Sequence, residues 1–281
     1  MFHLLVVIGW LPLWVLYRLS DATAVVLRFV VRYRLKVVRK NLQESFPDKS
    51  QRQLRRIEWQ YYRHLSDLLF EGIYNLRATP RQLLKRYQVV NRELADRYYE
   101  QGRSVILMSA HFNNWEYMVS TLNLQFRHHG VGVGKPLSNK RFGRQLNQRR
   151  TALGTQVVDQ TNVRQEMEYY HRYQVPVAYM MLGDQSPSSP KRCFRTSFLN
   201  HPDTAFLYGS EHFARKYNYP VLYYQVDKVR RGHYRITLEE LCPDPLSLPE
   251  GAITQTYAAR LERTILQAPQ YWLWSHRRWK F

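Results

Sequence analysis

His111 and Glu116 are a histidine and a carboxylate separated by four residues in the segment SAHFNNWEY, residues 109–117. A neutral imidazole can accept a proton from a hydroxyl group, which is general-base catalysis. A carboxylate bonded to the other ring nitrogen would fix the tautomer and stabilise the imidazolium. A hydroxyl activated in this way can attack an acyl carbonyl without a serine or cysteine nucleophile. Because this spacing also arises by chance in many proteins, the neighbouring sequence must decide whether the pair is functional.

The elements around His111 place it where α/β proteins bind their ligands. Residues 104–109 (SVILMS) form a short apolar run that is typical of a buried parallel strand. Sites in open α/β sheets lie at the carboxyl ends of such strands. Asn113 or Asn114 can cap a helix over residues 116–126, so Glu116 falls in its first turn. The loop before this helix can fold the imidazole of His111 back towards the Glu116 carboxylate.

The chain beyond residue 104 alternates strand patterns with helix patterns. Strands are predicted at residues 104–109, 130–134, 156–158, 176–181, 219–226 and 233–241. Helices are predicted at residues 116–126, 142–153, 163–173, 204–217 and 254–267. This alternation predicts an α/β fold with a mostly parallel or mixed central sheet flanked by helices. The last two strands are joined by the loop VRRGH, which is short enough for an antiparallel hairpin.

The first third of the chain is predicted to be helical. A turn at residues 47–48 separates two helices, and Ser50 can cap the second of them. Apolar residues then recur at helical spacing, and Thr79 begins another short helix. We therefore expect a separate segment at residues 1–40 and one domain at 41–281, helical over 41–103 and α/β over 104–281.

The protein has a net charge of +20, from 42 Lys and Arg against 22 Asp and Glu. Such a charge indicates which partners the protein attracts, and not which fold it adopts. Nucleic acid, an anionic membrane surface and an acidic substrate or carrier all attract such a protein. The sequence has no zinc-finger spacing, RNA-recognition aromatic motif or isolated basic arm, so we do not expect it to bind nucleic acid. The two cysteines, Cys193 and Cys242, suggest neither a disulfide framework nor a metal site. No metal and no organic cofactor is expected.

Residues 1–40 are expected to associate with a membrane. Residues 1–17 contain no Asp, Glu, Lys or Arg, but this run is slightly shorter than the about 20 apolar residues of a full span, and Pro12 interrupts it. Residues 18–42 interleave Arg and Lys with Val, Leu and Phe, a pattern typical of an amphipathic helix at lipid headgroups. If the first stretch enters the bilayer, the positive-inside rule places the rest in the cytoplasm. The alternative is a buried helix at the start of a soluble domain.

Six segments, in order along nearly the whole chain, resemble the bacterial lipid A late acyltransferases, the lauroyl/myristoyl transferase family of the lysophospholipid acyltransferase superfamily. Residues 109–117 resemble the H-x4-[D/E] block of that superfamily in its GHxGNWE form. The other segments are VVRKNLQESFP (37–47), YYRHLSDLLFEGI with its acidic Glu71 (61–73), GKPLSNKRFGRQLNQRRTALG (134–154), GDQSP (183–187) and YWLWSHRRWKF (271–281). Chance does not explain six matches in the right order.

The resemblance implies roles for the matched residues. His111 would be the general base and Glu116 its orienting partner. Arg150 would hold a phosphate or polarise the carbonyl of the acyl donor, and guanidinium geometry suits both tasks. Lys135 stands where the family usually has arginine. This change keeps the charge but loses bidentate recognition, so the way the substrate is held here is open.

Two further matched segments have two interpretations each. Asp184 and Gln185 would lie at a strand's carboxyl end beside the site, but their residue types also favour a simple turn. Arg277 and Arg278 would either join a membrane-interface patch of Trp and cations or line an anionic substrate site. His276, between them and the preceding Trp-rich run, is expected to be structural.

The implied activity is that of an O-acyltransferase in lipid A and lipopolysaccharide biosynthesis. It would move a fatty acyl group from an acyl thioester, on acyl carrier protein or coenzyme A, to a hydroxyl of a lipid A-type glycolipid precursor. The implied location is the cytoplasmic face of the bacterial inner membrane. Lys135 and the stretch RTSFLNHPDTAF at residues 195–206 keep an alternative open, namely the same chemistry on a lysophospholipid, an amino-acid lipid or another glycolipid.

Overall fold

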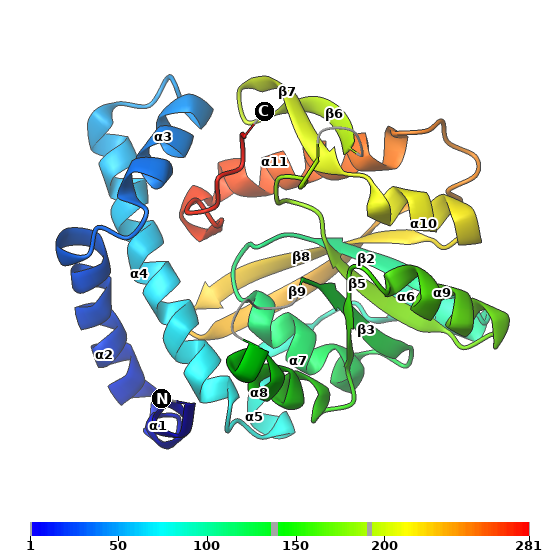
Figure 1. The fold of residues 1–281 in the computed structure, drawn as a ribbon, viewed down its shortest axis with the longest axis horizontal. Coiled ribbons are helices and arrows are strands. Elements are labelled where there is room, and N and C mark those ends of the chain that lie inside the picture. Colours follow the sequence, from blue (N-terminus) through cyan, green and yellow to red (C-terminus); the bar gives the residue numbers. More distant parts are fainter. Residues whose placement is uncertain (1, 136–139, 190–192, 281) are drawn as a thin grey trace.

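The computed structural model describes residues 2–135, 140–189 and 193–280, and its centre is a seven-stranded sheet in the order β1-β9-β8-β2-β5-β3-β4 (Figure 1). The strands are β1 (Tyr87–Val89), β2 (Val105–Ser109), β3 (His129–Gly134), β4 (Gln156–Asp159), β5 (Val177–Leu182), β8 (Val221–Arg230) and β9 (His233–Cys242). All neighbours pair in parallel except β8 and β9, which form the expected antiparallel hairpin. The predicted α/β class with a mostly parallel sheet is confirmed.

Helices cover both faces of this sheet because successive side chains of a strand point to opposite sides. Val105 and Leu107 of β2 belong to one hydrophobic cluster, and Ile106 and Met108 belong to the other. The first cluster includes residues of α5 (Pro80–Leu84), α6 (Glu93–Glu100) and α7 (Trp115–Gln125). The second includes residues of α9 (Val163–Arg172), α10 (Gly209–Tyr217) and α11 (Ala252–Gln267). A further helix, α8 (Lys140–Thr151), leads into β4.

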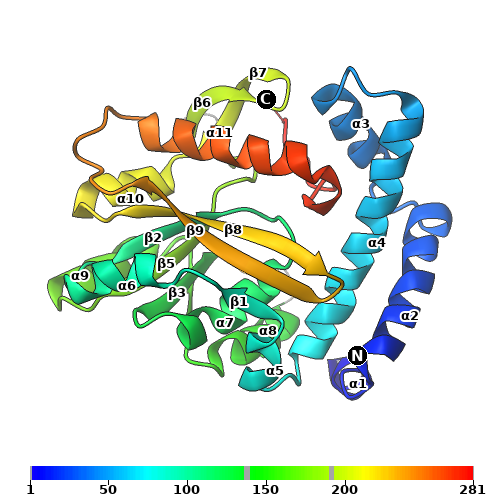
Figure 2. The ribbon, with the colours of Figure 1, turned by 180° about the vertical axis from the view of Figure 1, so that it is seen from behind.

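The N-terminal helices stand at one side of the α/β body, where α4 separates α2 from the sheet (Figures 1 and 2). They are α1 (Phe2–Ile8), α2 (Leu13–Val25), the π-helical turn η1 (Val26–Val30), α3 (Leu35–Ser45) and the long α4 (Gln51–Asn75). Ser50 caps α4 in a reciprocal capping box with Gln53, and Thr79 caps α5 in the same way with Gln82. The predicted cap at Ser50 and the predicted start of a short helix at Thr79 are confirmed.

The amphipathic helix expected over residues 18–42 is not continuous. It is divided into α2, η1 and α3, with left-handed backbone at Arg32 (φ 52°) and Arg34 (φ 48°). Such a conformation ends a right-handed helix, and non-glycine residues adopt it rarely. No helix in the described part of the chain is both long enough and apolar enough to cross a membrane.

The helix prediction over residues 204–217 was wrong at residues 204–208. Thr204 lies in β7 (His201–Leu207), which pairs antiparallel with β6 (Cys193–Phe198), and α10 begins only at Gly209. A two-residue turn joins these strands, with Leu199 (φ 49°) and Asn200 (φ 62°) both left-handed as tight hairpins require. The sequence did not reveal this hairpin because leucine is not a usual residue for such a turn.

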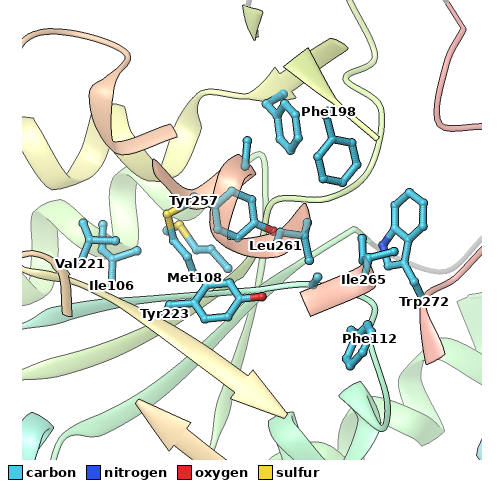
Figure 3. Packing of buried hydrophobic residues seen from close by; sticks show 14 of the residues in the cluster. Ile106, Met108, Phe112, Phe198, Val221, Tyr223, Tyr257, Leu261, Ile265 and Trp272 are labelled. Carbon is cyan, nitrogen blue, oxygen red and sulfur yellow. The ribbon is translucent and has the colours of Figure 1, made fainter. Parts of the chain in front are cut away.

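The C-terminal segment returns to the loop that carries His111. After the 3-10 turn η2 (Pro269–Tyr271), Trp272 forms an antiparallel bridge with Phe112. The amide of Asn113 donates to the Tyr271 carbonyl (3.0 Å), and the amide of Leu273 donates to the His111 carbonyl (3.1 Å). Figure 3 shows Trp272 and Phe112 in the cluster that packs between the sheet and α11. These two backbone hydrogen bonds of the bridge thus fix the loop from the far end of the chain.

Candidate active site

The site lies where two adjacent parallel strands end together. Ser109 of β2 is level with Leu182 of β5, and His111 and Asp184 each follow two residues later. The carbonyl of Ser109 accepts hydrogen bonds from the Gly183 amide (3.1 Å) and from the hydroxyl of Tyr257 in α11 (2.7 Å). A Cβ on Gly183 would lie 3.0 Å from the Tyr257 ring, so any larger residue would require this ring to move by a few tenths of an ångström.

Asp184 is the carboxylate that holds the imidazole of His111. Its Oδ1 lies 2.8 Å from His111 Nδ1, and its Oδ2 accepts from the His111 amide (3.0 Å) and from the Trp272 indole (2.9 Å). Burial by itself would raise the pKa of this carboxyl, but the charge of His111 and the hydrogen bonds from His111 and Trp272 outweigh it, so the pKa is lowered. Asp184 therefore stays ionised inside the protein and can stabilise a charged imidazole.

The amide of Gln185 indicates which ring nitrogen of His111 is free to act as a base. Its Nε2 lies 3.1 Å from His111 Nε2, and an amide nitrogen can only donate. His111 Nε2 is then the acceptor, and Nδ1 carries the proton that is donated to Asp184. This is the tautomer that a general base needs, with its lone pair directed away from the carboxylate. The Trp115 ring packs edge-on against the imidazole at 5.4 Å between centroids.

Glu116 faces a different partner. It lies in the first turn of α7, as expected, where its carboxylate accepts from Arg150 Nη2 (2.7 and 2.9 Å) and Nε (3.1 Å). No described hydrogen bond joins Glu116 to His111. The first turn of α7 directs this side chain towards α8, and the ring nitrogen that Glu116 was expected to bind is bonded to Asp184. The side chains of Arg150 and Glu116 are 19% and 24% exposed, so the pair can be reached from solvent.

The turn between His111 and α7 is anchored from three sides. Asn113 is left-handed (φ 56°), and its side-chain amide donates to the Val226 carbonyl of β8 (2.7 Å). Asn114 caps α7 through the Tyr117 amide (2.8 Å), which confirms one of the two predicted caps. The Asn114 amide also donates to buried Glu71 of α4 (2.6 Å). The position of the loop that carries His111 is thus linked to the N-terminal helices.

A comparison of the chain with models of protein families identifies its family. The model of the family described as bacterial lipid A biosynthesis acyltransferase matches residues 1–281. The chain belongs to this family. It is therefore an acyltransferase, and the family acts in lipid A biosynthesis. A search of the curated proteins gave no match to the chain.

The C-terminal arginines of this acyltransferase occupy different environments. Arg277 is exposed, whereas Arg278 is 2% exposed and stacks on the Phe206 ring at 4.5 Å from its centroid. Burial lowers the pKa of Arg278 to about 10, although the charge of Asp184 opposes this change. His276 accepts from the amide of Ser186 (3.1 Å), a bond between backbone and ring that suits its expected structural role.

Some of the predicted site residues lie in contact with one another, and others do not. The structure brings Asp184 and Gln185 to His111 and brings Arg150 to Glu116. Lys135 is exposed directly after β3, at the same edge of the sheet, and Pro136 beside it lies outside the described residues. Sequence reasoning assigned no role to Trp272 or Tyr257. Trp272 stands in one of the six matched segments, and that position was the only available signal.

Proposed function

We propose that this acyltransferase is an O-acyltransferase that uses an acyl thioester as donor and a hydroxyl of a lipid A-type glycolipid as acceptor, with His111 as general base. His111 Nε2 takes the hydroxyl proton while the oxygen bonds to the thioester carbonyl carbon. The carbon–sulfur bond then breaks, and the departing thiolate receives the proton from the imidazolium. The product is an ester and a free thiol, and the imidazole returns to its neutral form.

The observation that supports this proposal is the arrangement of Asp184, His111 and Gln185. The Asp184 carboxylate keeps the proton on Nδ1 and offsets the charge that His111 gains during transfer. The Gln185 amide occupies the position where an acceptor hydroxyl would meet Nε2. A substrate hydroxyl would replace this contact and find an aligned lone pair.

Arg150 is proposed to bind the acyl donor. Its guanidinium is fixed by Glu116 and by Asn147 Oδ1 (3.2 Å), so it is oriented before any substrate arrives. An oriented cation can stabilise the oxyanion of acyl transfer or hold a phosphate of the donor. Glu116 then acts on catalysis through Arg150, and Lys135 would add charge at the same edge. The donor would be acyl carrier protein or coenzyme A.

The direct test is transfer by the purified full-length protein. We expect an acyl thioester and a lipid A precursor to give a product heavier by one acyl chain in mass spectrometry, together with free thiol. A product that loses the chain on mild alkaline treatment would identify the ester. Transfer to a lysophospholipid or amino lipid, with lipid A precursors left unchanged, would refute the proposed acceptor.

The acyltransferase is further proposed to lie on an anionic membrane, at the cytoplasmic face of the inner membrane. Large apolar side chains are exposed on the outer side of α2 and η1, among them Trp14 (70%), Phe29 (56%) and Val30 (73%). Contiguous exposed apolar surface is unusual on a soluble monomer, and Trp favours the bilayer interface. Exposed Arg32 follows this apolar strip of α2 and η1 and carries the positive charge that anionic lipid attracts, whereas Arg28 is largely buried and paired with Glu58.

Replacing Trp14 and Val30 together by serine is expected to weaken binding to anionic vesicles roughly 10- to 100-fold. Each side chain loses part of the about 1.5–3 kcal/mol that full burial contributes, and a combined loss of about 1.4–2.8 kcal/mol is a factor of 10 to 100. The matched control replaces Leu246 (59% exposed) and Leu266 (53% exposed) by serine, away from these helices. Vesicle co-sedimentation measures the effect. Equal binding of both double variants would refute this membrane-facing assignment.

A further inference from the structure

A cationic groove of about 1010 Å³ lies between the start of α3 and the C-terminal segment. Figures 1 and 2 both show these two parts of the chain close together, near the end marked C. The groove is lined by Arg32, Arg34, Leu35, Lys36, Val37, Arg39, His276, Arg277 and Lys280. Most of these residues are Lys or Arg, and no carboxylate is among them. We call this feature the cationic groove.

Two of its arginines already have partners. Arg34 Nη1 donates to the Ser275 carbonyl (3.0 Å), which ties the two walls together, and Arg39 Nε pairs with Glu58 (2.8 Å). Four other cations, all exposed, have no ion pair within the described chain: Arg32, Lys36, Arg277 and Lys280. Like charges at such close quarters repel one another unless an anion lies between them. The cationic groove therefore favours an anionic ligand.

The cationic groove also lies between the loop that carries His111 and the apolar strip of α2 and η1. On one side, His276 of its wall accepts from Ser186, the neighbour of Gln185 that contacts His111. On the other side, exposed Phe29 and Val30 precede Arg32 in the chain by only a few residues. An amphiphile with its chains in the bilayer would meet this groove before its head group reached His111.

The size of the cationic groove selects among anions. Its volume is at the upper end of the about 300–1,000 Å³ that accommodates a drug-sized ligand, and is far larger than one phosphate ion needs. Phosphate esters are bound by converging Lys and Arg side chains. We propose that the cationic groove binds the phosphorylated sugar head group of the lipid acceptor and so presents its hydroxyl to His111. This inference rests on the proposed function, because that function defines the acceptor.

A phosphate ester could also come from the acyl donor, through the prosthetic arm of a carrier or coenzyme A. The acceptor is favoured because the cationic groove continues from the apolar strip, which faces the bilayer where the lipid acceptor resides. A water-soluble donor reaches the protein from solution and does not need a binding site next to the bilayer. The test must therefore separate the two sources of phosphate.

The test compares two double variants that each remove two positive charges. Lys36→Gln with Arg277→Gln changes both walls of the cationic groove. Arg164→Gln with Arg172→Gln changes two exposed cations of α9, at the opposite end of the molecule (Figure 1). The probe is a lipid A-type phosphorylated disaccharide lipid in neutral detergent micelles, used with and without enzymatic removal of its phosphates. Equilibrium binding is measured by titration, so no turnover is needed.

The groove variant is expected to bind the phosphorylated lipid roughly 10- to 100-fold more weakly, and the dephosphorylated lipid with little change. The α9 variant should match the parent protein, and in the transfer assay only the acceptor KM should rise. Equal weakening in both variants, unchanged binding in the groove variant, or a raised donor KM with normal lipid binding would each overturn the assignment. If the parent protein binds the phosphorylated lipid but transfers no acyl group, the proposed function fails and the groove assignment stands.

Discussion

Replacing Asp184 by asparagine is expected to lower kcat roughly 10³- to 10⁴-fold while leaving the fold intact. The asparagine amide would donate to His111 Nδ1, which drives the ring proton to Nε2. That nitrogen then has no lone pair for the acceptor hydroxyl. The acceptor KM should change little, because Asp184 is buried behind the imidazole and is not exposed to the substrate. His111→Ala should reduce kcat at least as strongly, since it removes the base itself.

Glu116→Gln is the control that separates the two carboxylates. Glutamine keeps one acceptor for Arg150, so we expect a smaller loss of kcat than for Asp184→Asn and a higher donor KM. Thermal unfolding of each variant would show whether a loss of activity reflects misfolding. If Glu116→Gln abolished turnover while Asp184→Asn remained active, Glu116 would be the orienting carboxylate that its spacing from His111 suggests. Asp184 would then have a structural role only.

Local spacing could predict the loop that holds His111 but not the carboxylate that holds its ring. The apolar run of β2, the Asn114 cap and the start of α7 are all encoded within a few residues. The pairing of His111 with Asp184 depends on β2 and β5 being neighbours in the sheet, although β3 and β4 lie between them in sequence. The order of strands in a sheet is a tertiary property, so no pattern near residue 111 reveals it.

The contacts of the C-terminal segment were even harder to predict from the sequence. Trp272 reaches Asp184 because the chain crosses the whole domain to pair with Phe112. The role of Trp272 depends on this pairing of residues far apart in the sequence, and no local periodicity indicates it. The same holds for the cationic groove, whose walls come from residues 32–39 and 276–280. Charge in the sequence predicted an anionic partner, but only the folded chain brings these cations to one place.

Glu71→Ala should be the most destabilising of the substitutions considered, at roughly 3–5 kcal/mol in the free energy of unfolding, since each buried donor left unsatisfied costs about 1–3 kcal/mol. The carboxylate is fully buried and accepts from the Tyr17 hydroxyl (3.0 Å), the Tyr234 hydroxyl (2.8 Å) and the Asn114 amide (2.6 Å). Alanine leaves these three donors without their acceptor and leaves a cavity beside them. Because Asn114 caps α7, the loop of His111 should also lose its position. Denaturant unfolding measures the first effect, and kcat of the remaining folded protein measures the second.

The pH dependence of this substitution tests the charge of Glu71 separately from its packing. Burial raises the pKa of Glu71, and Lys228, Tyr234 and Asn114 offset this only in part. A carboxyl whose pKa is higher in the folded than in the unfolded chain contributes stability that is complete at low pH and is lost as the pH rises through the folded pKa. Glu71→Gln cannot titrate, so the stability advantage of the parent protein over this variant should shrink as the pH rises above the ordinary glutamate pKa of about 4.3. An advantage that grows with pH would mean that Glu71 is held as a stabilised anion by its three donors.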